Sequence, residues 1–325
     1  MSVESREVSV ECADMPVKPP DVPAGSVGQP VESVADRFER VAGSRFLALF
    51  SPALFDEMMH PAVSASLVDT GRIRDDPFGR ARRTAASDQL AFIARSADRR
   101  EETHRLIQLH RDVKGVGPDG VRYSALSPEP WNWNLISIFF MHRGAFLALT
   151  GERLSAADNQ AIWDRFRALS ADLLMPGRAR QLTESYEELC TYYDQMATQT
   201  LRHTTALDIV MNATLRPRRP EHVPAVTDPL WKLLGPAGGH MVAVLGFGIM
   251  HPRARALVPM SWTRRHDIEF TLLTKLLRMA YRWLPSRITE TPLARNRREY
   301  ERIIARYKGV GLTSFAAGAT QTCGR

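Results

Sequence analysis

Residues 76–115 hold the side chains whose types and spacing best suit chemistry. His110 lies in an apolar stripe with Leu106, Ile107 and Val113 when the segment is read as a helix. An imidazole in apolar surroundings needs a hydrogen bond or a metal ion to satisfy its nitrogen atoms. His110 is therefore a candidate metal ligand, and a core histidine satisfied by a hydrogen bond is the alternative.

Basic and hydroxyl side chains accompany this histidine. Arg80, Arg83 and Thr84 fall at helical spacing and form one polar stripe before it, and Lys114 lies one helical turn beyond it. A haem site needs an axial donor on a rigid element, an apolar slot and cations for the propionates. The segment supplies all three, with His110 as the donor and Lys114, Arg80 or Arg83 as the cation.

Two helices must position these residues. Pro77 suits the start of the first helix, and a polar turn at residues 96–99 separates it from the second. Gly115, followed by Gly117 and Pro118, suits the end of the second helix. The segment is predicted to be an αα-hairpin.

The order and spacing of several short motifs resemble the family of rubber oxygenases (latex-clearing proteins) and MpaB-type oxygenases. The likeness extends over roughly residues 40–306. The motifs are His-Pro at 60–61, Asp-Pro-x-Gly-Arg-x-x-Arg-Thr at 76–84, His-x-x-Val-x-Gly at 110–115 and Tyr-Ser-Ala at 123–125.

The resemblance implies a helical, globin-like core that holds a b-type haem. It implies that His110 is the proximal iron ligand and that Arg80, Arg83 and Thr84 lie on the distal side, where Arg83 and Thr84 serve catalysis. The implied activity is oxidative attack by O2 on a C=C bond of an apolar substrate, which is lipid-, terpenoid- or polyketide-like.

The chain departs from the rubber-cleaving members at two places. They carry a lysine where this chain has Arg83, and a guanidinium stays charged and is a poor iron ligand. We therefore expect Arg83 to donate hydrogen bonds to bound oxygen or to a propionate. The carboxylate that serves as base in rubber cleavage has no counterpart in this chain, because Ser64 lies in that region before Arg80 and Asp69 is the carboxylate nearest to Ser64.

The remaining sequence predicts an all-α protein with one large helical domain. Helical periodicity recurs between the two ends of the chain, and a partly β-branched apolar run at residues 241–247 is the one ambiguous strand signal. Proline-rich residues 1–30 are predicted to be a disordered leader, residues 31–307 the helical domain and residues 308–325 a flexible tail. The leader has no signal-peptide pattern, so we expect a cytoplasmic protein.

Two other functions compete with the haem oxygenase. A di-iron carboxylate enzyme is suggested by Glu-x-x-His at Glu57–His60 and Glu101–His104, but Pro61 disfavours helical geometry at His60. A non-enzymatic helical ligand-binding or scaffold module would keep the fold without haem.

Charge and hydropathy limit the partners. The net charge of +7 is spread over 43 basic and 36 acidic residues, so we interpret it as a solvated basic surface and expect no nucleic-acid partner. No stretch has the run of about 18 apolar residues that a membrane-spanning helix needs. Residues 268–284 form a wide apolar helix face flanked by basic residues. A core helix is the favoured interpretation, and peripheral membrane contact is the alternative.

Overall fold

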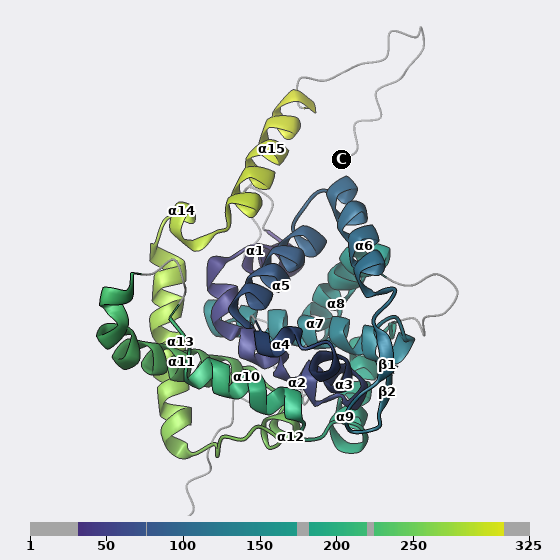
Figure 1. Cartoon of the computed structure of the whole chain (residues 1–325). Coiled ribbons are helices and arrows are strands. Elements are labelled where there is room, and N and C mark those ends of the chain that lie inside the picture. Colours follow the sequence, from purple (N-terminus) through teal and green to yellow (C-terminus); the bar gives the residue numbers. More distant parts are fainter. Residues whose placement is uncertain (1–31, 76, 174–181, 220–223, 309–325) are drawn as a thin grey trace, which may run out of the picture.

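The computed structural model describes residues 32–75, 77–173, 182–219 and 224–308. Helices make up most of this part of the chain and strands very little of it, which confirms the all-α class (Figure 1). The predicted leader at 1–30 and all of the predicted tail except residue 308 lie outside the described residues. The globin-like character of the core stays a prediction of the resemblance.

The N-terminal helices begin and end at local signals. The Ser33 hydroxyl accepts the amide of Asp36 at 3.1 Å and caps the first helix, which ends at Gly43. His60 has extended backbone (ψ 124°) before Pro61, as expected for a residue that precedes proline, and its Nδ1 accepts the amide of Ala62 at 3.2 Å. These elements are α1 (Val34–Ala42), η1 (Arg45–Leu54), α2 (Phe55–Met59) and α3 (Pro61–Asp69).

The predicted hairpin is present, but its turn lies at residues 93–95, and the predicted turn at 96–99 is the first turn of the second helix. The hairpin follows the short α4 (Arg72–Asp75) and consists of α5 (Pro77–Phe92) and α6 (Ser96–His110). The second helix ends at His110, earlier than predicted, so the expectation that Lys114 continues the helix one turn beyond His110 is wrong.

Lys114 instead begins a two-stranded antiparallel sheet of β1 (Lys114–Val116) and β2 (Arg122–Ser124). Gly115 pairs with Tyr123, and a Cβ at Gly115 would lie 2.9 Å from the Tyr123 hydroxyl, so the close approach requires glycine. Tyr123 also donates a hydrogen bond to Asp69 at the end of α3. Tertiary contacts therefore decide the conformation of this segment.

The core is organised around α7 (Pro128–Thr150), which is buried along most of its length and ends at Gly151 in the left-handed conformation (φ 74°). It packs against α1, η1, α11 and α13. Phe139 on α7 lies 4.8 Å from Trp163 and 5.3 Å from Phe166, ring centre to ring centre. Both partners belong to α8 (Ala156–Ser170), which starts with a capping box of Ser155 and Asp158.

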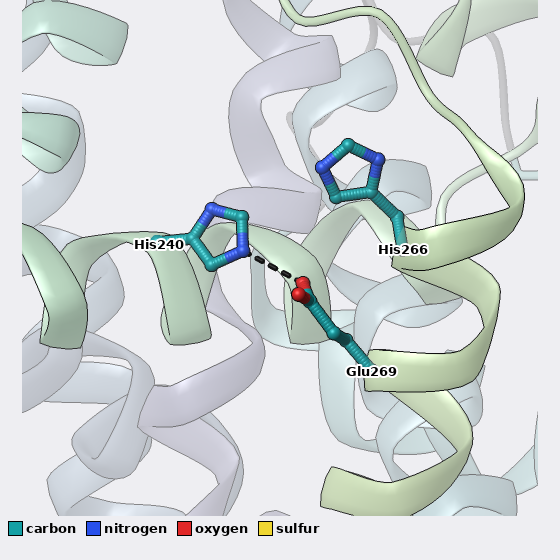
Figure 2. A group of neighbouring side chains, drawn as sticks. All are labelled: His240, His266 and Glu269. Carbon is teal, nitrogen blue, oxygen red and sulfur yellow. Dashed lines mark hydrogen bonds and ion pairs between the residues drawn. The ribbon is translucent and has the colours of Figure 1, made fainter.

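The remaining elements close the core from the other side and extend beyond it. They are η2 (Ala171–Leu173), α9 (Tyr186–Gln199), α10 (Thr205–Leu215), η3 (Ala225–Thr227), α11 (Asp228–Ile249), α12 (Pro252–Arg255), α13 (Arg264–Trp283), α14 (Ser286–Thr289) and α15 (Pro292–Lys308). The ambiguous apolar run at 241–247 is helical and belongs to α11. His240 of α11 faces His266 and Glu269 of α13 where these two helices meet (Figure 2).

Two apolar helices differ from the sequence-based expectation. Within the described chain, α11 alone has the length and hydropathy to cross a membrane. Its second half is buried against the core, as in a core helix of the same length and composition. The interpretation of α13 as a core helix is wrong for one of its faces. Thr274 is its one fully buried residue, and a row of large apolar side chains on it is exposed: Ile268, Leu272, Leu276, Met279 and Trp283.

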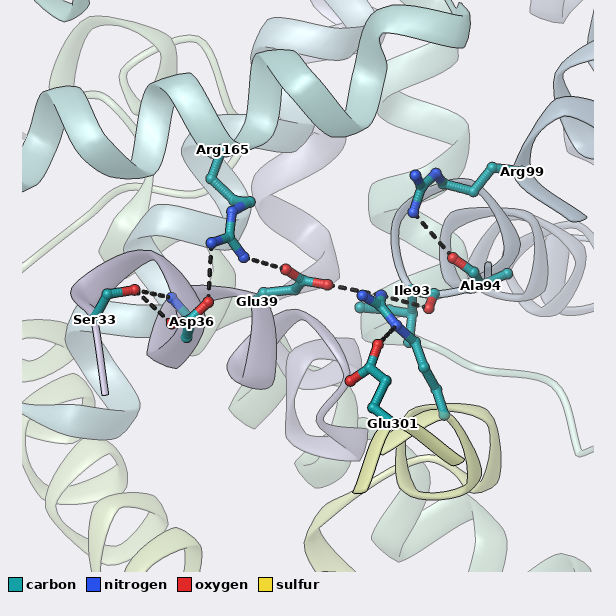
Figure 3. A network of polar contacts seen from close by, with 9 residues as sticks. Ser33, Asp36, Glu39, Ile93, Ala94, Arg99, Arg165 and Glu301 are labelled. Atoms are coloured by element: carbon teal, nitrogen blue, oxygen red, sulfur yellow. Dashed lines mark hydrogen bonds and ion pairs between the residues drawn. The ribbon is translucent and has the colours of Figure 1, made fainter. Parts of the chain in front are cut away.

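A cluster of ion pairs fixes the turn of the α5–α6 hairpin to the rest of the protein (Figure 3). Glu39 of α1 binds Arg165 of α8 at 2.6 Å and Arg297 of α15 at 2.7 Å. Arg297 also donates to the Ile93 carbonyl at 2.8 Å, and Arg99 donates to the Ala94 carbonyl at 3.0 Å. Because the turn carbonyls at 93 and 94 are held in this way, the direction of both hairpin helices is set at the turn.

Candidate active site

His110 lies at the C-terminal end of α6, where its ring contacts a backbone carbonyl and an aromatic side chain. Its Nδ1 lies 2.7 Å from the carbonyl oxygen of Leu106, one helical turn earlier, where Nδ1–H donates. The ring meets Trp131 of α7 edge to face, with centres 5.6 Å apart and planes at 85°. Trp131 is itself buried and donates to the Leu173 carbonyl at 2.9 Å. This arrangement fixes the tautomer, so Nε2 is the nitrogen that could coordinate a metal ion.

The α5 residues differ in exposure. Arg80 is half-buried, whereas Arg83 and Thr84 are exposed. Lys114 is exposed on β1. It lies beyond the end of α6 and is therefore not on the helix that carries His110. Among Arg80, Arg83, Thr84 and Lys114, Arg80 is therefore the least exposed.

Arg80 and His110 lie at the same end of the hairpin, away from its turn. Ser87 of α5 donates to Glu102 of α6, and Arg105 donates to the same carboxylate at 2.7 Å. With a rise of 1.5 Å per residue, Arg80 lies about 10 Å along α5 from Ser87, and His110 lies about 7.5 Å along α6 from Arg105. The Ser87–Glu102 hydrogen bond thus joins the two helices close to the turn. Arg80 and His110 lie farther from the turn than this bond.

Glu57, which the sequence did not single out as an acid or base, lies close enough to Arg80 for the positive charge to affect its carboxyl group. Burial raises the pKa of Glu57 on α2 well above its usual range, the neighbouring Asp56 raises it further, and the positive charge of Arg80 opposes the shift. Asp88 of α5 also raises the pKa of Glu57. A carboxyl group with a raised pKa beside a cationic side chain is typical of acid–base sites.

Two buried histidines also lie close to carboxylates. His142 of α7 is almost fully buried, and its Nε2 lies 3.4 Å from Asp88. His60 is also buried, and its Nε2 lies 3.6 Å from Glu129. Burial lowers the pKa of His60 and Glu129 opposes the shift. A polar region therefore lies between α2, α5 and α7, inside an otherwise aromatic core.

The Glu-x-x-His pairs do not form a di-iron site. Glu101 and His104 are exposed on α6, and His60 turns toward Glu129. Across the described ranges, one group of three histidine or acidic side chains has metal-binding spacing, and it contains none of these residues.

A cavity of about 390 Å³ lies on another face of α7. Its lining includes Asp56, Ser137, Tyr193 and His251. The phenol of Tyr193 and the hydroxyl of Ser137 both donate to the Asp56 carboxylate. Since Trp131, which contacts His110, lies six residues before Ser137, this cavity and His110 are on different sides of the helix.

Residues 40–279 match the family described as ER-bound oxygenase mpaB/B'/Rubber oxygenase, catalytic domain. The chain belongs to this family. Two of its relatives are the uncharacterized protein Rv2237 of Mycobacterium tuberculosis and the uncharacterized protein Mb2261 of Mycobacterium bovis. Each is 26% identical over 231 residues, which cover 69% of this chain and 83% of the relative. No solved structure matches the chain.

The mpaB/rubber oxygenase match begins in α1 and ends in α13. It therefore includes the hairpin, α7 and the polar region around Glu57. The family identifies the chain as an oxygenase catalytic domain. Helix α15 lies outside the match and projects from the body of the molecule (Figure 1).

Proposed function

We propose that this oxygenase uses haem b, with His110 as the axial iron ligand. The observation that carries the proposal is the 2.7 Å contact between His110 Nδ1 and the Leu106 carbonyl. A histidine that ligates a metal through Nε2 characteristically donates its Nδ1–H to a backbone carbonyl, which orients the ring and raises its basicity. The residues present therefore fit a haem ligand better than an unspecialised core histidine.

The other hairpin residues have complementary roles in this proposal. Arg80 and Lys114 supply positive charge for the propionates, and Arg83 and Thr84 supply hydrogen-bond donors on the distal side. Haem, when bound, supplies the capacity to bind and activate O2. Because a guanidinium keeps its proton, Arg83 would hold a distal ligand by hydrogen bonds and would not coordinate the iron.

Glu57 is the acid–base group of the site in this proposal. The resemblance gave no counterpart for the base of the rubber-cleaving members, whereas folding brings Glu57 from α2 close enough for the charge of Arg80 to act on it. A carboxyl group with a raised pKa can hold a proton at a pH where an ordinary glutamate has lost it, and can return that proton. The glutamate would therefore hold a proton beside Arg80 and exchange it with the substrate within one reaction cycle, with no net proton released.

The substrate class in this proposal is apolar, and the exposed face of α13 supports it. Ile268, Leu272, Leu276, Met279 and Trp283 form a continuous apolar row. Lys275 and Arg282 are exposed beside it. An apolar helix face with flanking cations suits peripheral contact with an anionic membrane, where lipid-like substrates concentrate.

Pyridine haemochrome analysis of protein expressed with a haem precursor tests the proposal. We expect about one haem b per chain and a Soret band. Colourless protein without iron would overturn the haem proposal and favour the helical ligand-binding module.

A further inference from the structure

Three side chains with metal-binding chemistry meet between α11 and α13, and no role in the haem proposal accounts for them. His240 comes from the middle of α11, and His266 and Glu269 come from the first turns of α13. One ligand atom of each lies within 4.8 Å of the other two. Figure 2 shows both imidazole rings and the carboxylate facing a common space.

We infer that His240, His266 and Glu269 form a binding site for a divalent transition-metal ion, with zinc as the expected occupant. Two imidazole nitrogens and one carboxylate oxygen are a donor set that Zn²⁺ accepts, with a fourth position left for water. All three side chains are half-buried, so a metal ion can reach them from solvent.

The surrounding contacts leave one suitable atom of each side chain for the ion. Nδ1 of His266 accepts the backbone amide of Thr263 at 3.0 Å, so Nε2 carries the ring proton in the metal-free protein. Coordination through Nε2 would move that proton to Nδ1, where the Thr263 hydroxyl, also at 3.0 Å, can accept it in place of the amide bond. Arg265 donates to Oε1 of Glu269 at 2.7 Å, so Oε2 is the oxygen turned toward the cluster. Both secondary contacts orient a ligand without occupying its coordinating atom.

The three side chains need only small movements to bind a zinc ion. His240 Nε2 already lies 2.7 Å from Glu269 Oε2. Ligand atoms that are each 2.0–2.1 Å from a tetrahedral zinc ion lie about 3.3 Å apart. The His240–Glu269 pair must therefore separate slightly and give up its shared proton, while the ring of His266 approaches. Coordination would replace one hydrogen bond with a link between α11 and α13.

A simple surface hydrogen bond is the competing explanation, and the chain contains a matched example of one. His203 Nε2 lies 2.9 Å from Asp208, in a histidine–carboxylate pair without a second histidine. A pair of this kind binds zinc weakly because it offers two ligands. His203 therefore serves as the control for His266, whose removal leaves the His240–Glu269 pair intact.

The experiment is a calorimetric titration of Zn²⁺ into tag-free, metal-stripped full-length protein, repeated with Co²⁺ while its visible absorption is recorded. We expect one zinc ion per chain and a cobalt spectrum typical of four or five ligands. His266→Ala and Glu269→Gln should each weaken zinc binding at least ~100-fold, whereas His203→Ala should leave it unchanged. Zinc should also raise the melting temperature of the wild type but not of His266→Ala.

Zinc binding that survives both His266→Ala and Glu269→Gln would overturn the inference, and so would the absence of saturable binding in the wild type. Circular dichroism of each variant establishes that it is folded before titration. None of the proposed haem-binding residues belongs to the cluster, so the zinc result and the haem content are independent.

Discussion

The phenol of Tyr193 donates a 2.5 Å hydrogen bond to the carboxylate of Asp56, which lies 137 residues earlier in the chain and is completely buried. Ser137 of α7 donates to the same carboxylate. Burial raises the pKa of Asp56 from 3.8 to about 6, although both hydroxyl groups oppose the shift. The buried carboxyl thus joins α2, α7 and α9 at the cost of an unfavourable charge near neutral pH.

This pKa gives a pH dependence with a defined sign. Between pH 3.8 and about 6 the folded protein holds a proton on Asp56 that the unfolded chain has released, so the free energy of unfolding falls as the pH rises through this range. Relative to Asp56→Asn, the wild type should lose about 3 kcal/mol across the range and little above it. Urea unfolding at several pH values measures the difference, and a difference that grows with pH would contradict the prediction.

His110 and His104 provide a matched pair for the axial ligand. They are six residues apart on α6, which places them about 120° apart around the helix axis. His110 is half-buried against Trp131, whereas His104 is exposed. His110→Ala should lose most of the haem, and His104→Ala should keep it, as measured by the Soret band and pyridine haemochrome. Full haem content in His110→Ala would show that the ligand assignment is wrong.

The role of Glu57 can be tested without knowledge of the substrate. If Glu57 titrates close to the haem, the Soret absorbance of the wild type should show a pH-dependent step above the usual range for glutamate. Glu57→Gln should remove the step and retain haem. Glu101→Gln changes an exposed carboxylate on α6 and should leave the step in place. An identical titration in the Glu57 variant would exclude this residue as the acid–base group.

Substitutions on the exposed face of α13 are expected to weaken membrane binding while leaving the stability of the protein nearly unchanged. Burying a leucine is worth ~1.5–3 kcal/mol, so replacing Leu272 and Leu276 together by Gln should weaken binding to anionic phospholipid vesicles at least ~tenfold. The free energy of unfolding should change by less than about 0.5 kcal/mol per site. Leu273→Gln, on the face packed against the core, should instead destabilise the protein. Equal vesicle binding by the double variant in a flotation assay would argue against membrane contact through this face.

The parts of this structure that could be predicted from the sequence depend on local signals. The hairpin of α5 and α6 and the Ser155–Asp158 capping box follow from proline, polar turns and apolar periodicity over a few residues. The candidate ligand His110 could be singled out because its helix and its family motif are continuous in the sequence.

The features that escaped prediction depend on contacts between distant residues. The strand pairing of Gly115 with Tyr123 is too short to leave a periodic pattern, and the sheet is fixed by the bond from Tyr123 to Asp69. Glu57 acquires its raised pKa only when folding buries it. His240 and Glu269 lie 29 residues apart on two helices, so their meeting depends on how those helices cross.

Small residues in α11 also decide how closely it packs against α10, and two adjacent glycines give the sharpest test. A Cβ at Gly239 would overlap the backbone carbonyl oxygen of Thr214 near the end of α10, whereas a Cβ at Gly238 would meet no atom within 4 Å. Backbone atoms cannot rotate away as a side chain can, so Gly239→Ala must push α10 from α11 and should cost about 1–3 kcal/mol.

Gly238→Ala should do the opposite. Alanine has a higher helix propensity than glycine, so this change within α11 should stabilise the protein by up to about 1 kcal/mol. Thermal and urea unfolding measure the stability of the two variants. Both replace glycine by alanine, and they differ in whether the new methyl group meets α10. If both variants were stabilised, the close packing of α10 against Gly239 would be refuted.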